Sequence, residues 1–200
     1  MKYLATLHMV QFSFWDMQTF HFAKDGTAII GANGAGKTSL IDGIQIAMVG
    51  AHGQHMNFNA QSVHKDSRLL RDYALGAMRS NDNPDDKSTT IVARKREEAL
   101  SYITMVFRGE RANETVSAGV CIHSTINDKN HKVLGLFVLP GVDLTLEDHL
   151  EVVGTAGARA PVDWDQFEAL IRSRAKAAGL TPTITTKPEH YMEELLHSIQ

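Results

Sequence analysis

The sequence of 200 residues predicts a mixed α/β fold, and three observations support this class. Two strand-like runs fill most of residues 3–22, at the start of the chain. A glycine-rich loop at residues 31–38 then separates a short apolar run from an amphipathic segment of helical period. Three further strand-like runs, joined by polar turns, lie between residues 100 and 139. Helices and strands in this arrangement are expected to share one core.

The first strand-like run alternates along an extended chain, so its residues divide between two faces. One face carries Leu4, Thr6, His8, Val10, Phe12 and Phe14, and the other carries Tyr3, Ala5, Leu7, Met9 and Gln11. Thr19–Phe22 predicts a second short strand, and Asp25-Gly26 predicts a turn. Thr27–Ile30 is expected to form a short buried strand that leads into the glycine-rich loop.

Residues 31–38 (GANGAGKT) fill every fixed position of the phosphate-binding pattern Gly-x4-Gly-Lys-Ser/Thr. Gly34 and Gly36 let the backbone turn without a Cβ clash, so that successive N–H groups converge on phosphate oxygens. Lys37 is expected to reach the β- and γ-phosphates of ATP, and the Thr38 hydroxyl to bind the Mg²⁺ that bridges them. The other nucleotide contacts expected from this loop are Asn33, Ala35 and Ser39.

The segment Thr38–Val49 predicts a helix that starts directly after the loop. Its amino terminus would point the positive end of the helix dipole at the bound phosphates. The side chains expected on its inner side are Leu40, Ile41, Ile44 and Met48. Strand, glycine loop and helix follow in the order that the phosphate-binding pattern requires, which argues against a chance glycine-rich turn.

The middle of the chain predicts a helical turn near Ser67–Leu75, a solvated loop at Ser80–Ser88 and an antiparallel meander. The strands of the meander are Leu100–Phe107, Thr115–His123 and Lys132–Leu139. Pro140-Gly141 ends the last of them, and a short helix is expected at Leu144–Val153.

Two helices are expected near the end of the chain. Asp163 with Gln166 resembles a capping box, which would open a helix that runs to Ala178 and ends at Gly179. Pro188 would start the second helix, whose apolar stripe consists of Tyr191, Leu195, Leu196 and Ile199. Because the chain stops inside this pattern, we expect the sequence to be a fragment of a longer protein.

Composition restricts the possible partners. The fractions of hydrophobic residues (43%) and charged residues (22%) are those of a globular domain, and the single Cys121 permits no internal disulfide. No apolar run approaches the roughly 18 residues of a membrane span, so a cytoplasmic protein without membrane contact is expected. The formal charge of −3 gives no general attraction to nucleic acid. The basic concentration Arg94-Lys95-Arg96 could contact DNA phosphates, but beside Glu97-Glu98 it is equally consistent with a solvated charged face.

Three stretches together resemble the amino-terminal head lobe of the SMC-like ATPases, and in particular the MukB, MksB and JetC (Wadjet and condensin-like) branch. The stretch GANGAGKTSLIDGIQ at residues 31–45 resembles the ABC and SMC form of the loop and its helix. Val10–Phe12 with Thr19–Phe22 is similar to the aromatic strand before the loop. Asn57–Ala60 followed by Arg68–Gly76 resembles a segment of MksB and JetC proteins, and this third match narrows the branch.

The resemblance implies a fold of the P-loop NTPase class, ABC/SMC head type, with an antiparallel β subdomain. Residues 1–180 would form the amino-terminal head lobe, and residues 181–200 a linker and the start of a coiled-coil arm. The acidic Walker B strand and the signature loop would lie in a carboxy-terminal lobe, and neither motif is recognisable in this sequence. The catalytic residues are therefore unknown, and we expect weak nucleotide binding without turnover by this chain alone.

The resemblance also suggests roles for single residues. Arg71 matches the arginine of a loop that approaches the phosphates in SMC heads, while an ion pair with the neighbouring Asp72 is an equally plausible role. The glutamine that the family places near the end of the strand around Phe137–Val142 is missing. Asp143 could take over its role on the metal side.

The function that the resemblance implies is a nucleoid-associated ATPase that extrudes or entraps DNA loops, for chromosome organisation or plasmid defence. Its partners would be a second identical head, a kleisin, a winged-helix subunit, a topoisomerase-like nuclease and double-stranded DNA. A DNA-repair ATPase of the RecF, RecN or SbcC type shares the loop and is the first alternative. A small-molecule P-loop kinase fits less well, because two strands precede the loop. A nucleotide-dependent interaction module without turnover is the third alternative.

Overall fold

The centre of the molecule is a six-stranded antiparallel sheet with the strand order β10-β7-β6-β5-β1-β2. The structure is a computed structural model that describes residues 1–53, 70–80, 90–111 and 114–200. The strands of the sheet are β1 (Tyr3–Phe12), β2 (Trp15–His21), β5 (Glu98–Arg108), β6 (Thr115–Thr125), β7 (Lys132–Pro140) and β10 (Thr183–Thr185). The meander expected from the sequence is confirmed as β5-β6-β7. It is continuous with the opening strands, because β1 pairs with β5.

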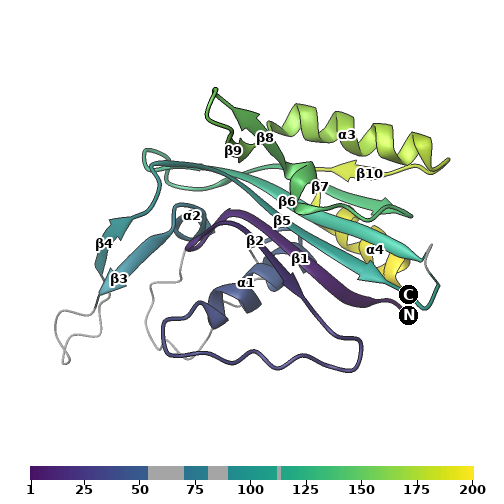
Figure 1. Cartoon of the computed structure of the whole chain (residues 1–200), viewed down its shortest axis with the longest axis horizontal. Coiled ribbons are helices and arrows are strands. Elements are labelled where there is room, and N and C mark those ends of the chain that lie inside the picture. The colour runs from purple at the N-terminus through teal and green to yellow at the C-terminus, as the bar shows by residue number, and fades with distance from the viewer. Residues whose placement is uncertain (54–69, 81–89, 112–113) are drawn as a thin grey trace.

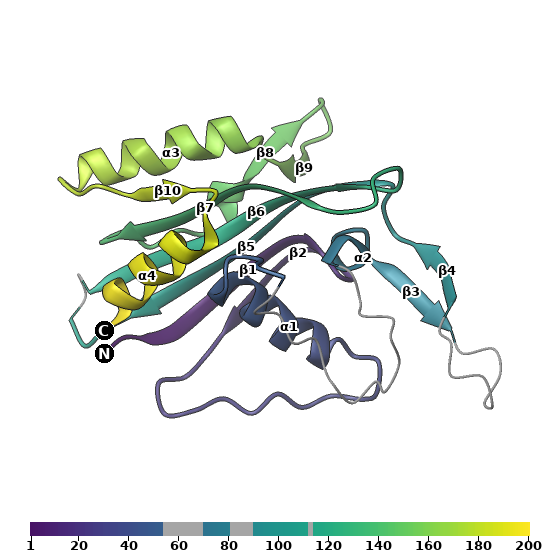
Figure 2. The same ribbon diagram turned by 180° about the vertical axis from the view of Figure 1, so that it is seen from behind.

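Helices cover both faces of this sheet, so the fold has three layers (Figure 1). One face packs against α1 (Lys37–Met48), α2 (Leu70–Ala74) and α4 (Pro188–Ile199). The opposite face packs against α3 (Trp164–Ala177) and the 3-10 helix η1 (Leu146–His149). Two small hairpins complete the fold, β3 (Ala77–Ser80) with β4 (Thr90–Arg94) and β8 (Leu150–Val153) with β9 (Ala158–Pro161). The β3–β4 hairpin extends away from the sheet (Figure 2).

Strand β1 is buried on both faces, but its alternation breaks near its end. Met9 packs with the α1 side of the sheet and Val10 with the α3 side, as period-two alternation requires. Gln11 has a φ of 47°, in the left-handed region, and this reverses the alternation. Phe12 therefore lies on the α1 side with Met9. The expected common face is wrong at both ends, because Leu4, which precedes a bulge between Leu4 and Thr6, also packs on the α1 side.

The strand expected at Thr27–Ile30 is absent from the structure, where these residues are irregular and exposed. Ile30 is 91% exposed, although its apolar side chain predicted burial. The sheet ends at β2, and no described strand pairs with this segment. A strand forms where a neighbouring strand pairs with its backbone N–H and C=O groups. An apolar run indicates burial, but it does not show whether such a neighbouring strand is present.

Helix α1 confirms the helix expected after the loop and most of its expected inner side. Leu40 is buried, and the half-buried Ile44 and Met48 pack against the core, whereas Ile41 is 55% exposed. Ile46 and Ala47 are fully buried as well. The sequence Leu-Ile-Asp-Gly-Ile-Gln-Ile has apolar residues around the whole helix, so periodicity alone did not show that Ile41 faces outward and Ile46 inward.

Two expectations near the end of the chain need correction. The helix expected at Leu144–Val153 is only one 3-10 turn, η1, after which Leu150–Val153 forms β8 and pairs with β9. Cross-strand hydrogen bonding outweighs the local helical pattern there. Helix α3 begins after Asp163 as expected and ends before Gly179, but the Asp163 side chain makes no capping hydrogen bond.

Helix α4 packs on the α1 side of the sheet. Tyr191 is fully buried, and its phenol O–H donates to the carbonyl of Ala47, at 2.7 Å. The backbone N–H of Lys2 donates to the carbonyl of Ile199, at 2.9 Å, so the two ends of the described chain lie side by side (Figures 1 and 2). The coiled-coil arm and the boundary at residue 180 stay predictions. None of the helices formed by the described residues is long and apolar enough to cross a membrane.

We predict that Tyr191→Ala lowers the free energy of unfolding by about 3–5 kcal/mol, because it opens a cavity between α4, α1 and the sheet. Leu196→Ala is the matched control on the same helix. Its side chain is 51% exposed, so it should cost at most about 0.5 kcal/mol. Urea denaturation of both variants measures this difference. Equal effects would mean that α4 does not dock on the sheet in solution.

Two histidines, His8 and His149, are buried between the sheet and η1 with their ring centroids 6.0 Å apart. His8 Nε2 donates to the carbonyl of Leu144 at 3.0 Å, and His149 Nδ1 donates to the carbonyl of Thr145 at 2.8 Å. Burial lowers the pKa of both imidazoles, and burial together with the neighbouring His8 brings the pKa of His149 to about 4. Both rings are therefore neutral in the folded protein near pH 7.

The low pKa of His149 predicts acid sensitivity. The unfolded chain binds a proton at His149 below pH 6.5 while the folded protein does not, so stability falls as the pH drops from 6.5 towards 4. The loss from this group is about 3 kcal/mol at pH 4. His149→Gln should flatten the dependence of unfolding free energy on pH over this window, measured by urea denaturation. The same slope in both proteins would contradict the assignment.

Candidate nucleotide site

The phosphate-binding loop has the backbone conformation that its glycines predict. Gly34 and Gly36 have φ values of 83° and 89°, which side chains with a Cβ rarely adopt. A Cβ on Gly36 would also lie 2.9 Å from the Trp15 ring. Helix α1 starts at Lys37, and the N–H of Leu40 donates to the carbonyl of Gly36 at 2.9 Å. The amino terminus of α1 therefore opens directly onto the loop.

The Lys37 side chain folds back over its own loop. Its Nζ donates to the carbonyls of Gly31, at 2.6 Å, and Ala32, at 2.7 Å. These two contacts hold the start of the loop against the start of α1. An anion in the loop would offer Lys37 a charged acceptor, which makes a stronger hydrogen bond than a neutral carbonyl.

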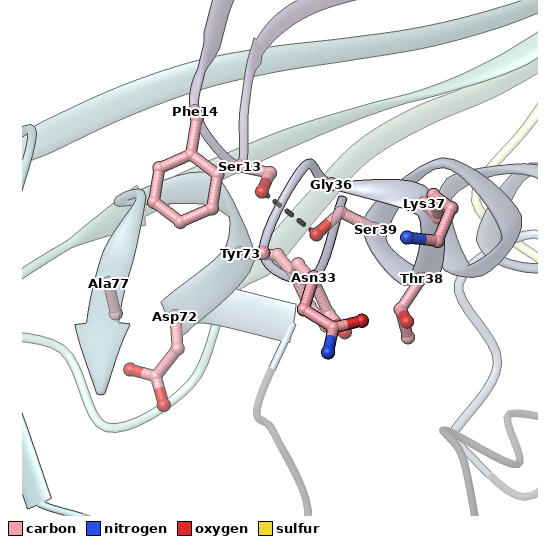
Figure 3. A pocket seen from close by; sticks show the side chains of 11 residues that line it. Ser13, Phe14, Asn33, Gly36, Lys37, Thr38, Ser39, Asp72, Tyr73 and Ala77 are labelled. Carbon is pink, nitrogen blue, oxygen red and sulfur yellow. Dashed lines mark hydrogen bonds between the residues drawn. The ribbon is translucent and has the colours of Figure 1, made fainter. Parts of the chain in front are cut away.

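The loop borders an open pocket of about 390 Å³ whose walls come from three parts of the chain (Figure 3). In this view Phe14 and Asp72 lie to the left of the loop, and Lys37 and Thr38 lie to its right. The lining residues are Ser13, Phe14, Asn33, Gly34, Gly36, Lys37, Thr38, Ser39, Asp72, Tyr73 and Ala77. Backbone amides, an ammonium and a hydroxyl at a helix amino terminus form a donor set that fits a nucleotide triphosphate with Mg²⁺.

The turn between β1 and β2 forms one wall of the pocket. It is hydrogen-bonded to the other two walls, which are the phosphate-binding loop with α1 and the segment around α2. The Ser13 hydroxyl donates to the Ser39 hydroxyl, at 3.0 Å, and the Ser13 N–H donates to the carbonyl of Tyr73, at 2.7 Å. The Tyr73 phenol donates to the buried carboxylate of Asp42 on α1, and its ring stacks on Phe12 at 5.3 Å. Helices α1 and α2 and the β1–β2 turn are thus connected by buried hydrogen bonds.

Six of the eight nucleotide-contact residues expected from the sequence line this pocket. These are Asn33, Gly34, Gly36, Lys37, Thr38 and Ser39, while Ala35 belongs to the same loop without lining it. Ser39 is buried, and its hydroxyl accepts from Ser13, so its contribution to the site is structural.

The structure does not bring Arg71 to the pocket. Its guanidinium donates to the carbonyl of Asp128 in the turn after β6, and Nη2 lies 3.6 Å from the Asp72 carboxylate. The neighbouring Asp72 and Tyr73 line the pocket instead. The arrangement matches the ion-pair alternative, and a phosphate contact by Arg71 stays a prediction. Asp143 pairs with Arg108 and does not line the pocket, so its suggested metal-side role gains no support.

The side chains of the basic cluster Arg94-Lys95-Arg96 make ion pairs and hydrogen bonds with other parts of the same chain. Arg96 donates to several backbone carbonyls of the β1–β2 turn and α2, and Lys95 pairs with Asp16 at 2.6 Å. Arg94 Nη2 lies 3.9 Å from Asp72. These contacts give Lys95 and Arg96 partners within the chain, and a DNA contact by the cluster stays a prediction. Charge density in the sequence did not reveal that the partners are backbone carbonyls.

The sequence did not assign five of the pocket residues to the site, namely Ser13, Phe14, Asp72, Tyr73 and Ala77. Phe14 was placed on a strand face, but it lies in the turn after β1 and is 45% exposed. No pattern in the sequence marked it, because the same alternation that predicts the strand continues through Phe14. The stretch Asn57–Ala60, used for the resemblance, lies outside the described residues.

Residues 4–65 match the family described as the P-loop containing region of AAA domain. No curated protein matches the chain. The chain therefore has an amino-terminal P-loop NTPase region, and this class indicates nucleotide binding. Among the described residues, no group of three or more histidine, cysteine or acidic side chains could hold a metal ion. The P-loop class typically uses Mg²⁺ together with the nucleotide.

We predict that Lys37→Ala lowers the affinity for Mg²⁺-ATP by at least about tenfold, because the phosphates lose their one direct ammonium partner in the loop. Lys24→Ala is the matched control. Its side chain is exposed and pairs with Glu110 at 3.3 Å, away from the pocket lining. Isothermal titration calorimetry measures both affinities. Equal binding by the wild type and Lys37→Ala would show that the loop does not hold the phosphates.

Proposed function

We propose that this chain is the ATP-binding lobe of an SMC-like ATPase of the MukB, MksB and JetC type. The observation that carries the proposal is the pocket in which the phosphate-binding loop at the start of α1 faces the exposed aromatic ring of Phe14. One side of this pocket offers donors to phosphate, and the other offers a flat apolar surface. This polarity suits a nucleotide, which has an anionic end and an aromatic end.

The residues divide between the two ends of the nucleotide. The backbone N–H groups around Gly34 and Gly36, with Lys37, would hold the phosphates, and the Thr38 hydroxyl would bind Mg²⁺. Lys37 would exchange the carbonyls of Gly31 and Ala32 for phosphate oxygens. Phe14 would stack against the base, since aromatic stacking suits every base. The bound Mg²⁺ would supply charge neutralisation of the phosphates.

The polar groups in the pocket support binding more than hydrolysis. Hydrolysis of ATP needs a group that positions or activates the attacking water. Asp72 is the single carboxylate among the described residues that line the pocket, and it lies near Arg71 and Arg94. The Asp72 carboxylate lies 3.6 Å from Arg71 Nη2 and 3.9 Å from Arg94 Nη2, so it is already engaged in ion pairs. We infer that the catalytic acidic group comes from another polypeptide segment, as in the two-headed ATPases that the sequence resembles.

The open side of the loop supports the same proposal. Residues 31–35 are exposed, and so are Ile29 and Ile30 in the segment before them. Another segment that covered these side chains would also enclose the phosphates and exclude water from them. In the SMC-like class this cover would come from the carboxy-terminal lobe and a second head.

The role in DNA organisation is the further part of the proposal, and it rests on the sequence resemblance. Its partners would be a kleisin, winged-helix subunits, a topoisomerase-like nuclease and double-stranded DNA. Because Lys95 and Arg96 are engaged inside the fold, DNA contacts would come from other surfaces of the assembled complex. The nucleotide cycle of the heads would drive loop extrusion or entrapment for chromosome organisation or plasmid defence.

We predict that the 200-residue chain binds Mg²⁺-ATP but hydrolyses it no faster than Lys37→Ala, because Asp72, the single carboxylate among the described lining residues, pairs with arginines. Release of inorganic phosphate, followed over hours at saturating ATP, measures this. Turnover by the wild type that Lys37→Ala abolishes would mean that the chain contains a complete site. That result would favour an enzyme of the small-kinase or AAA kind over half of a composite site.

A further inference from the structure

Arg96 makes an unusual number of contacts for a residue in a charged run. Its side chain is only 8% exposed. Nη1 donates to the carbonyls of Ser13, at 3.0 Å, and Ala74, at 3.1 Å. Nη2 donates to the carbonyl of Trp15, at 2.8 Å, and to the Asp16 carboxylate, at 2.6 Å. One guanidinium therefore connects the β1–β2 turn to α2.

Lys95 completes this arrangement from the neighbouring position. Its Nζ donates to the carbonyl of Phe14, at 2.9 Å, and to the second carboxylate oxygen of Asp16, at 2.6 Å. The carbonyls of three consecutive residues, 13 to 15, thus accept hydrogen bonds from two adjacent cations. We refer to Lys95 and Arg96 as the cationic clamp.

The turn that the clamp holds needs outside support. Phe12 pairs with Trp15, so Ser13 and Phe14 form a two-residue turn. Ser13 has a φ of 54°, in the region that such turns usually fill with glycine. Without the clamp, a serine there would favour other backbone conformations. The direction of the Phe14 ring would change with them, because Phe14 is the next residue in the turn.

We propose that Arg96 is a positioning residue for nucleotide recognition, which fixes the Phe14 turn so that the ring faces the base end of the pocket. The inference rests on the proposed function, in which this pocket binds ATP. It assigns to Arg96 a role in binding of the base instead of DNA contact. Arg96 does not line the pocket and acts through the backbone of the turn.

The test compares two ligands that differ only in whether they carry a nucleoside, Mg²⁺-ATP and Mg²⁺-tripolyphosphate. Isothermal titration calorimetry gives both dissociation constants for the intact wild-type chain, Phe14→Ala, Arg96→Ala and the double variant. Arg172→Ala is the matched control, because it removes a surface arginine that pairs only with Glu168 on α3, on the other face of the sheet. Arg96→Lys is used as well, since it keeps the charge but cannot bridge several acceptors in one plane.

Loss of a stacked base weakens binding by about tenfold. We therefore expect Phe14→Ala and Arg96→Ala each to raise the dissociation constant for ATP by about this factor, while that for tripolyphosphate stays within about twofold. The double variant should be no weaker than Phe14→Ala, because both changes remove the same contact. Arg96→Lys should also lose selectivity for ATP, which keeps the proposal testable if Arg96→Ala fails to fold. Arg172→Ala should match the wild type.

Equal weakening of both ligands by Arg96→Ala or Arg96→Lys would overturn the proposal, because it would show a general structural role. Additive effects of Phe14→Ala and Arg96→Ala would overturn it too. Failure of the proposed function gives a different result, in which the wild-type chain binds neither ligand. The wild type could instead bind both ligands equally, with no effect of Phe14→Ala. That result would support phosphate binding by the loop but would contradict both the contact of Phe14 with the base and the role of Arg96.

Discussion

The β1–β2 turn is the contact on which the nucleotide pocket depends. The walls of the pocket come from residues 13–14, 33–39 and 72–77, which are distant in sequence. Ser13 bonds to both of the other walls, through its hydroxyl to Ser39 and through its N–H to Tyr73. Its carbonyl accepts from Arg96. A single turn with three buried connections therefore sets the distance between the phosphate-binding loop and α2, and with it the width of the pocket.

The three-layer core explains why this turn can be held so firmly. Strands β1, β5, β6 and β7 are buried on both faces, so the sheet has little freedom to move under the site. Cys121 lies in that interior, where burial raises the pKa of its thiol and keeps it protonated. The candidate nucleotide pocket lies at one end of the sheet, at the turn from β1 to β2.

The basic cluster Arg94-Lys95-Arg96 shows that a run of cations can bind either an external anion or acceptors within the same chain. Three adjacent cations in a sequence favour phosphate contact, because an exposed cation attracts any anion. In the structure Arg96 is nearly buried, and its acceptors are mostly backbone carbonyls. Carbonyls occur at every residue, so no sequence pattern marks the ones that will receive a guanidinium. Only the approach of β4 to the β1–β2 turn selects these carbonyls.

Features that depend on neighbours along the chain could be predicted from the amino-acid sequence. These are the loop at 31–38, the helix that follows it, the β5-β6-β7 meander and the end of α3 at Gly179, since glycine conformations, helical period and turns are local. Tertiary structure decided that Ile41 faces outward, that Thr27–Ile30 forms no strand and that Leu150–Val153 does. It also decided that Phe14 joins the site while Arg71 turns away to Asp128. Burial, strand pairing and long-range hydrogen bonds each need a partner far along the chain, and a local pattern describes only one of the two partners.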